Sequence, residues 1–89
     1  MTSKTTRRFR DAYGRLPEHV RRRAREAYRR FTSDPSHPSL RFKKVHATEP
    51  IYAARVGLGY RARAVLDGDV AVWFWIGIHA DYDQLLRTL

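Results

Sequence analysis

The 89-residue chain has no cysteine, and only nine of its residues are acidic. Without cysteine it can form neither a disulfide nor a thiolate metal site, and it has no thiol nucleophile. The longest apolar run, Val70–Ile78, is too short to cross a bilayer. Because the N-terminus also lacks the apolar stretch of a signal peptide, we expect a cytoplasmic protein. The four histidines are scattered without the spacing of metal ligands, so we expect no metal centre and no other cofactor.

Positive charge is present in excess and is unevenly distributed. Eighteen Lys and Arg residues against nine Asp and Glu give a formal net charge of +9, and residues 1–46 carry fourteen of those cations. Most of them are arginines, which form planar, bidentate contacts with phosphate. Such a chain attracts polyanions: nucleic acid, an acidic protein segment or an anionic membrane surface. A basic face that serves only solubility is the alternative.

The first forty residues have the pattern of two helices. Apolar side chains recur at helical spacing over residues 9–16 and again over 20–31, with Pro17 suited to the start of the second helix. Pro35 and Pro38 then end that helix. Two favourable pairs one helical turn apart are expected on its surface, Glu18–Arg22 and Glu26–Arg30.

The pattern then changes to the period of two that is typical of β-strands. We predict strands over residues 40–46, 51–57, 60–66 and 70–78, and a short amphipathic helix over 81–89. The Asp-Gly sequence at residues 67–68, between two apolar runs, predicts a tight hairpin. We therefore predict one α+β domain over residues 1–89, with the helical hairpin packed on a four-stranded antiparallel sheet.

Alternation along the last strand assigns its side chains to two faces. Val70, Val72, Phe74 and Ile76 are expected to face the helices, which leaves Trp73 and Trp75 on the opposite face with Arg61 and Arg63 of the preceding strand. Aromatic rings among guanidinium groups are typical of a surface that binds single-stranded nucleic acid. The alternative is that both tryptophans belong to the core, because a shift of one residue inverts every assignment.

Several segments, in this order and spacing, resemble toxins of the RelE/ParE superfamily from bacterial type II toxin–antitoxin systems. They are the basic helical hairpin, HPSLRFKK at residues 37–44, Arg-Val-Gly at 55–57, Tyr-Arg at 60–61, Asp-Gly-Asp at 67–69 and WIGIHADY at 75–82. The closing GIHADY is most similar to the YafQ-type and YoeB-type branches. The resemblance covers about residues 8–83 and implies two helices packed on an antiparallel sheet.

The resemblance also implies an activity, the metal-free cleavage of messenger RNA on the ribosome. The 2′-hydroxyl of the RNA attacks the adjacent phosphate, so the reaction needs a base, an acid and cations on the phosphorane. His79 matches the catalytic histidine of the family, and Arg55 and Arg61 match its phosphate-contacting positions. Tyr82 lies where relatives place an aromatic residue that stacks on a base or orients the phosphate. Alternatively, His79 caps the following helix, Arg61 bonds to backbone carbonyls and Tyr82 packs in the last helix.

The remaining candidate residues would bind the RNA. Lys43 and Lys44 match basic positions of the relatives, and the predicted RNA-binding surface adds four further side chains: Arg41, Arg63, Trp73 and Trp75. The partners that the resemblance implies are messenger RNA, the ribosome and an antitoxin encoded by the neighbouring gene.

The chain departs from the family pattern in two places. Most relatives begin with a β-strand, whereas residues 1–6 show no strand pattern, so we expect that edge of the sheet to be missing. A second proton-handling residue is also not evident, since His46 and Glu49 do not align with one. Two other functions therefore stay open: a non-enzymatic ParE-like toxin that inhibits DNA gyrase, and a basic domain that binds RNA or a partner without catalysis.

Overall fold

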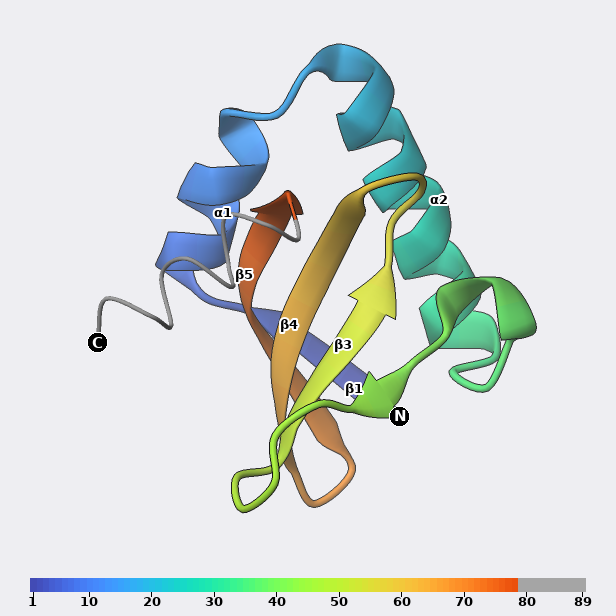
Figure 1. Ribbon diagram of the computed structural model, residues 1–89, viewed down its shortest axis with the longest axis vertical. Coiled ribbons are helices and arrows are strands. Elements are labelled where there is room, and N and C mark those ends of the chain that lie inside the picture. Colours follow the sequence, from blue (N-terminus) through green and yellow to red (C-terminus); the bar gives the residue numbers. More distant parts are fainter. Residues whose placement is uncertain (79–89) are drawn as a thin grey trace.

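The computed structural model describes residues 1–78 and shows two helices packed on one sheet (Figure 1). In chain order the elements are β1 (Thr2–Thr5), α1 (Arg7–Gly14), α2 (Glu18–Ser33), the 3-10 turn η1 (Pro38–Leu40), β2 (Lys43–Lys44), β3 (Ile51–Arg55), β4 (Tyr60–Asp67) and β5 (Val70–Ile78). The predicted α+β class and helical hairpin are confirmed. The helix predicted over residues 81–89 lies outside the described residues. No helix within residues 1–78 is both long and apolar enough to span a membrane.

The sheet has five strands in the order β1-β5-β4-β3-β2, so the predicted count of four was wrong. β1 lies parallel to β5, with Thr2 opposite Val70 and Thr5 opposite Trp73, and the other neighbours are antiparallel. The N-terminal edge is therefore present. The sequence TSKT did not reveal it because an edge strand with one neighbour needs no apolar alternation.

The strand predicted over residues 40–46 shrinks to the two residues of β2. Residues 38–40 instead form η1, where the imidazole Nδ1 of His37 accepts a hydrogen bond from the backbone N–H of Ser39. Arg41 follows with a φ of 46°, in the left-handed region. Backbone in that region does not continue a strand, so pairing with β3 begins only at Lys43.

The two helices begin where the sequence provides a start signal. The Thr6 hydroxyl accepts a hydrogen bond from the backbone N–H of Phe9 and caps α1, and α2 starts directly after Pro17. The predicted ion pairs of α2 are different in the structure. Glu18 pairs with Arg21 at 2.8 Å and with Arg25 at 3.3 Å, and within residues 1–78 no ion pair joins Glu26 to Arg30.

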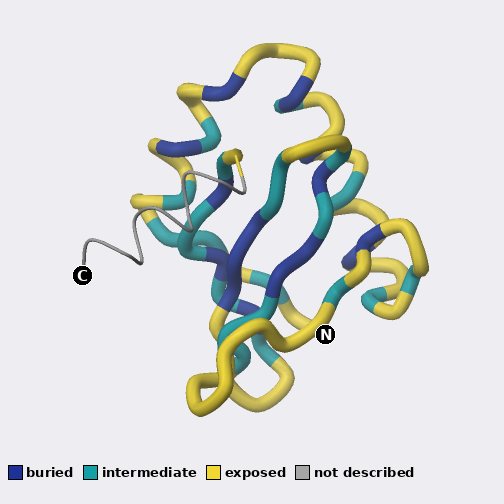
Figure 2. The backbone as a smooth tube through the Cα atoms, in the orientation of Figure 1, coloured by how far each residue is buried: buried dark blue, intermediate teal, exposed yellow. Residues whose placement is uncertain are grey.

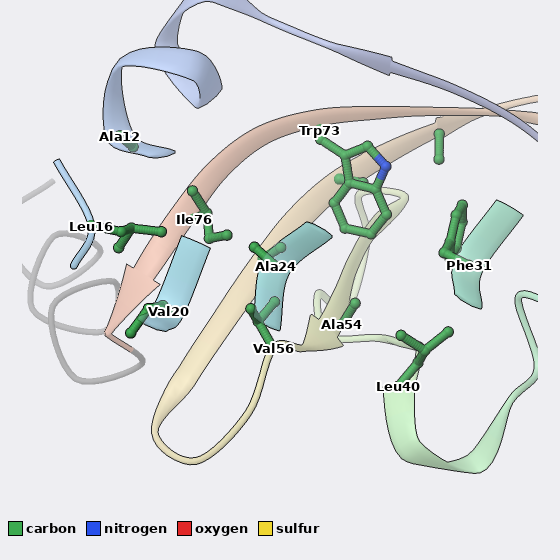
Figure 3. Close-up of a cluster of buried hydrophobic side chains, with 13 residues drawn as sticks. Ala12, Leu16, Val20, Ala24, Phe31, Leu40, Ala54, Val56, Trp73 and Ile76 are labelled. Atoms are coloured by element: carbon green, nitrogen blue, oxygen red, sulfur yellow. The ribbon is translucent and has the colours of Figure 1, made fainter. Parts of the chain in front are cut away.

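The core lies between the helices and one face of the sheet (Figures 2 and 3). Phe31, Leu40 and Val20 are its largest fully buried side chains. Trp73 of β5 is 4 % exposed and meets Phe31 edge to face, with ring centroids 5.2 Å apart. The sheet contributes mostly small side chains, since Ala64 and Ala71 are completely buried, and these leave room for the indole.

A β-bulge in β5 explains why the predicted faces were partly wrong. Ala64 of β4 lies opposite Trp73 and Arg63 lies opposite Trp75, so Phe74 has no partner in β4. An extra residue shifts the alternation by one position. Trp73 therefore points to the helices, and the prediction that it lies on the open face was wrong.

The residues on either side of the bulge follow from the same shift. Ala71, and not Val70 or Val72, faces the core before the bulge, which contradicts the prediction. After the bulge the prediction is confirmed, because Ile76 is buried in the core and Trp75 shares the opposite face with Arg63.

Candidate functional site

The face of the sheet that points away from the helices carries five of the eight predicted site residues that lie within residues 1–78. Directly paired residues of neighbouring strands share a face, and the pairing gives two adjacent rows across the sheet. The first row runs Lys43, Ala53, Arg63, Trp75 and the second runs Arg55, Arg61, Gly77. We call this set of seven residues the basic face.

Arg55 and Arg61 lie directly opposite each other on β3 and β4. Like charges in this arrangement repel and destabilise a sheet. An anion bound between them would offset the repulsion, and two guanidinium groups are the donors that best match the oxygens of a phosphate. The pair is therefore the strongest candidate for an anion site on the basic face.

Arg61 is also held by the main chain of the turn before it. One of its amino nitrogens, Nη1, donates to the carbonyl oxygen of Tyr60 at 2.8 Å and to that of Gly57 at 3.5 Å. The turn is made by Gly57 and Gly59, with φ values of 104° and 80° that favour glycine. The structural role left open for Arg61 is thus present, because these two hydrogen bonds hold its guanidinium against the main chain of the turn.

Trp75 lies over Gly77, a residue that was not among the candidates predicted from the sequence. A Cβ atom at Gly77 would stand 2.7 Å from Cζ2 of the indole, closer than side chains approach one another. Only glycine therefore lets the ring lie across the strand at this point, in the row that contains Arg61. The signal in the sequence was Trp-Ile-Gly, an aromatic residue and a glycine on the same face of one strand.

Arg63 belongs to the basic face, but it is only 3 % exposed. It occupies the row between Ala53 and the half-buried Trp75. Its guanidinium therefore lies below the surface of the face, and Lys43 is the exposed cation of that row.

Three predicted RNA-binding residues are not brought to this face. Trp73 is in the core, where its Nε1–H donates to the hydroxyl of Ser3 at 3.2 Å. Lys44 pairs with Tyr52 and so points to the helix side of the sheet edge. Arg41 is exposed in the turn before β2.

Two of the three histidines within residues 1–78, His37 and His46, have hydrogen bonds to neighbouring residues. Nδ1 of His46 accepts hydrogen bonds from the backbone N–H of Glu49 at 2.9 Å and of Thr48 at 3.2 Å, which closes the loop between β2 and β3. No group of metal-ligating side chains occurs within residues 1–78. The predicted catalytic residues His79 and Tyr82 lie outside the described residues, and His79 follows the last residue of β5 in sequence.

A second surface feature is an apolar groove on the helix side of the molecule. It has a volume of about 310 Å³ and lies between α1 and α2 over the sheet, with Trp73 and Ile76 among the residues of its lining. Tyr28 is 40 % exposed there, and Arg10 and Arg29 also line the groove. We call it the helix groove.

Comparison with known proteins is consistent with this architecture. The sequence profile of the ParE-like toxin domain matches residues 18–84. The chain belongs to the ParE-like toxin domain family. A search of curated protein sequences finds no significant match.

Solved structures of other ParE-like and RelE-like toxins share its fold. The chain is 19 % identical to a protein of the RelB–RelE antitoxin–toxin complex from Methanococcus jannaschii, with a TM-score of 0.76 over 92 % of this chain and 96 % of that one. YafQ from Escherichia coli gives 8 % identity and a TM-score of 0.73 over 90 % and 94 %. The YoeB/ParE toxin from Agrobacterium tumefaciens gives 13 % and 0.70 over 89 % and 99 %. At these identities the similarity establishes the RelE-like fold of this ParE-like domain.

Proposed function

We propose that this ParE-like domain is the toxin of a type II toxin–antitoxin system and cleaves messenger RNA on the ribosome. The observation that carries the proposal is the opposed pair Arg55 and Arg61 on a basic face that also presents Trp75. Two guanidinium groups suit a phosphodiester, and an aromatic ring beside them suits an unstacked base. Membership of the toxin family and the cytoplasmic character expected from the sequence agree with a target in the translation machinery.

The proposed reaction needs no metal. The 2′-oxygen of the RNA attacks the adjacent phosphorus, the bond from phosphorus to the 5′-oxygen breaks, and a 2′,3′-cyclic phosphate results. A base takes the proton of the 2′-hydroxyl and an acid gives a proton to the departing 5′-oxygen. We assign one of these transfers to His79, whose ordinary pKa suits proton transfer near neutral pH. Arg55 and Arg61 stabilise the charge of the phosphorane.

Other side chains would bind and orient the RNA. Trp75 and Tyr82 stack on bases, and Lys43 contacts the strand from the exposed end of its row. Lys44 and Arg41 contribute charge at the edge of the sheet. Arg63 supports the ring of Trp75 from below, since it is buried in the same row.

The proposed antitoxin partner would bind the helix groove. The groove is lined mainly by apolar side chains, and the arginines Arg10 and Arg29 also line it. An amphipathic segment with acidic residues beside its apolar face complements that combination. Two structures with the same fold are antitoxin–toxin complexes, from Methanococcus jannaschii and Mycobacterium tuberculosis.

Replacement of His79 tests the activity. In the His79→Ala variant we expect growth arrest on expression to disappear and the rate of messenger RNA cleavage on ribosomes to fall by about 10²–10⁴-fold, the usual contribution of a general acid or base. His19→Ala is the matched control, because His19 is exposed on α2 at the opposite side of the fold from the basic face. Undiminished cleavage by His79→Ala would contradict the nuclease proposal, and DNA damage with intact messenger RNA would identify a gyrase inhibitor.

A further inference from the structure

A basic cleft lies at the outer edge of β3, between that strand and α2. It has a volume of about 320 Å³, close to the lower end of the range for ligand pockets. Arg23, Glu26 and Arg30 line it from α2, and Arg55 and Gly57 line it from the end of β3. Figure 1 shows α2 running along this side of the sheet. We call these five residues the edge cleft.

The edge cleft exists because β2 is too short to cover β3. β2 pairs only with Tyr52 and Ala53, so beyond Ala53 no strand of the described chain bonds to that edge. Backbone groups of a strand in an antiparallel sheet point alternately to its two sides. Val56 bonds to Tyr60 of β4 and Ile51 bonds to Val45 on the β2 side. By this alternation the backbone N–H of Arg55 points outward, toward the edge cleft.

Within the part of the chain that the structure describes, the cations of the edge cleft make no ion pair with a carboxylate. The ion pairs found within residues 1–78 join Arg21 and Arg25 to Glu18, and none involves Arg23, Arg30 or Arg55. Arg23 and Arg30 are seven residues apart on α2, about 10.5 Å along the helix axis and on the same side of it. The two therefore place positive charge at both ends of one wall, with the carboxylate of Glu26 between them in sequence.

Arg23 is seated against the end of the strand. A Cβ atom added to Gly57 would stand 3.0 Å from Cδ and 3.4 Å from Nη1 of Arg23, so the side chain lies directly over this glycine. With a φ of 104° the position also favours glycine on backbone grounds. The absence of a side chain at Gly57 thus lets Arg23 reach across the edge, and the contact orients its guanidinium within the cleft.

We propose that the edge cleft binds a backbone phosphate of single-stranded RNA, next to the phosphate held by Arg55 and Arg61. This inference rests on the proposed function, because Arg55 belongs both to the cleft and to the basic face and makes the two sites continuous. Guanidinium groups together with an outward backbone N–H are the donors that phosphate contacts use. An amphipathic acidic peptide needs an apolar groove, and the adjoining helix groove is the more apolar of the two, although Ala27, Leu40 and Val56 line both.

The experiment measures binding of a 2′-O-methylated RNA oligonucleotide, which has no free 2′-hydroxyl and is not cleaved. The affinity is determined at several salt concentrations for the unaltered chain and for the variants Arg23→Ala and Arg30→Ala. Each variant should bind more weakly, and the slope of log affinity against log salt should lose about 0.7 for each phosphate contact removed. Glu26→Gln should strengthen binding, since it removes the only carboxylate among the described residues of the cleft.

Arg22→Ala is the matched control, because it removes the same charge from the same helix outside the cleft. Equal effects of Arg22→Ala and Arg23→Ala on the slope would overturn the proposal, as would binding of a polyglutamate peptide, but not RNA, that depends on Arg23 and Arg30. The result is separable from the nuclease test. If His79→Ala leaves cleavage intact while Arg23→Ala still alters the RNA slope, the edge cleft stands and the catalytic assignment fails.

Discussion

Two tryptophans separated by one residue have opposite environments in this protein. Trp73 is buried against Phe31 and bonded to Ser3, whereas Trp75 is half-buried on the basic face over Gly77. The single extra residue Phe74 separates these environments. At the residue scale, therefore, stability depends on one indole and the proposed RNA stacking depends on the other.

Fluorescence can distinguish the two rings, because they are the only tryptophans of the chain. In Trp75→Phe the remaining emission comes from Trp73, which at 4 % exposure should be shielded from acrylamide and unaffected by RNA. In Trp73→Phe the emission comes from Trp75, and both acrylamide and RNA should change it. Strong acrylamide quenching in Trp75→Phe would contradict the bulged register.

Trp73→Ala should lower the free energy of unfolding by about 3–5 kcal/mol, the usual cost of removing a buried aromatic ring.

The limits of sequence-based prediction can be seen at the same residues. Both helices and the hairpin at Gly68 followed from local patterns, because helical spacing and Asp-Gly turns are encoded within a few neighbouring residues. The bulge was not predictable in this way, because Trp73, Phe74 and Trp75 are all aromatic and any register buries some of them. The opposition of Arg55 and Arg61 was not visible either, since it depends on the pairing of two strands.

At the scale of elements, strand β1 and the start of helix α2 show how polar sequence still specifies structure. β1 is held to β5 by backbone pairing and by the hydrogen bond from Trp73 to Ser3. The few apolar residues of β1 would not predict a strand at this position. α2 begins with Glu18, whose carboxylate accepts hydrogen bonds from Arg21 and Arg25. Negative charge at a helix N-terminus also interacts favourably with the helix dipole.

Glu18 gives the stability of the fold a dependence on pH. Hydrogen bonds first from Arg21 and then from Arg25 lower the pKa of this carboxyl below its ordinary value. The folded state therefore binds the proton less readily than the unfolded state. The stability that ionised Glu18 adds to the fold is fully present above the pKa of the unfolded state, and it is lost as the pH falls through the pKa of the folded state. In urea unfolding, Glu18→Gln should be less stable than the unaltered chain near neutral pH, and the difference should vanish in acid. A difference that persists at low pH would contradict this assignment.

At the scale of the whole molecule, the sheet separates two surfaces of different chemistry. The basic face lies on one side with Arg55 and Arg61, and the apolar helix groove lies on the other with Tyr28 and Arg29. If the antitoxin binds the helix groove as proposed, it leaves the residues of the basic face uncovered. Any inhibition from the helix groove would then act by steric exclusion from the ribosome or by a shift in the fold.

The separation predicts variants that lose one property and keep the other. Tyr28→Ser together with Arg29→Glu should weaken neutralisation by the antitoxin, because it removes apolar area and reverses a charge at the groove. Cleavage of messenger RNA should be retained. Lys43→Glu on the basic face should reduce cleavage and leave neutralisation unchanged. The measurements are growth on coexpression with the antitoxin and cleavage on purified ribosomes, with Arg22→Glu as the control outside both surfaces. If the groove variants lose cleavage as severely as Lys43→Glu, the two surfaces are not independent and the antitoxin site must be placed elsewhere.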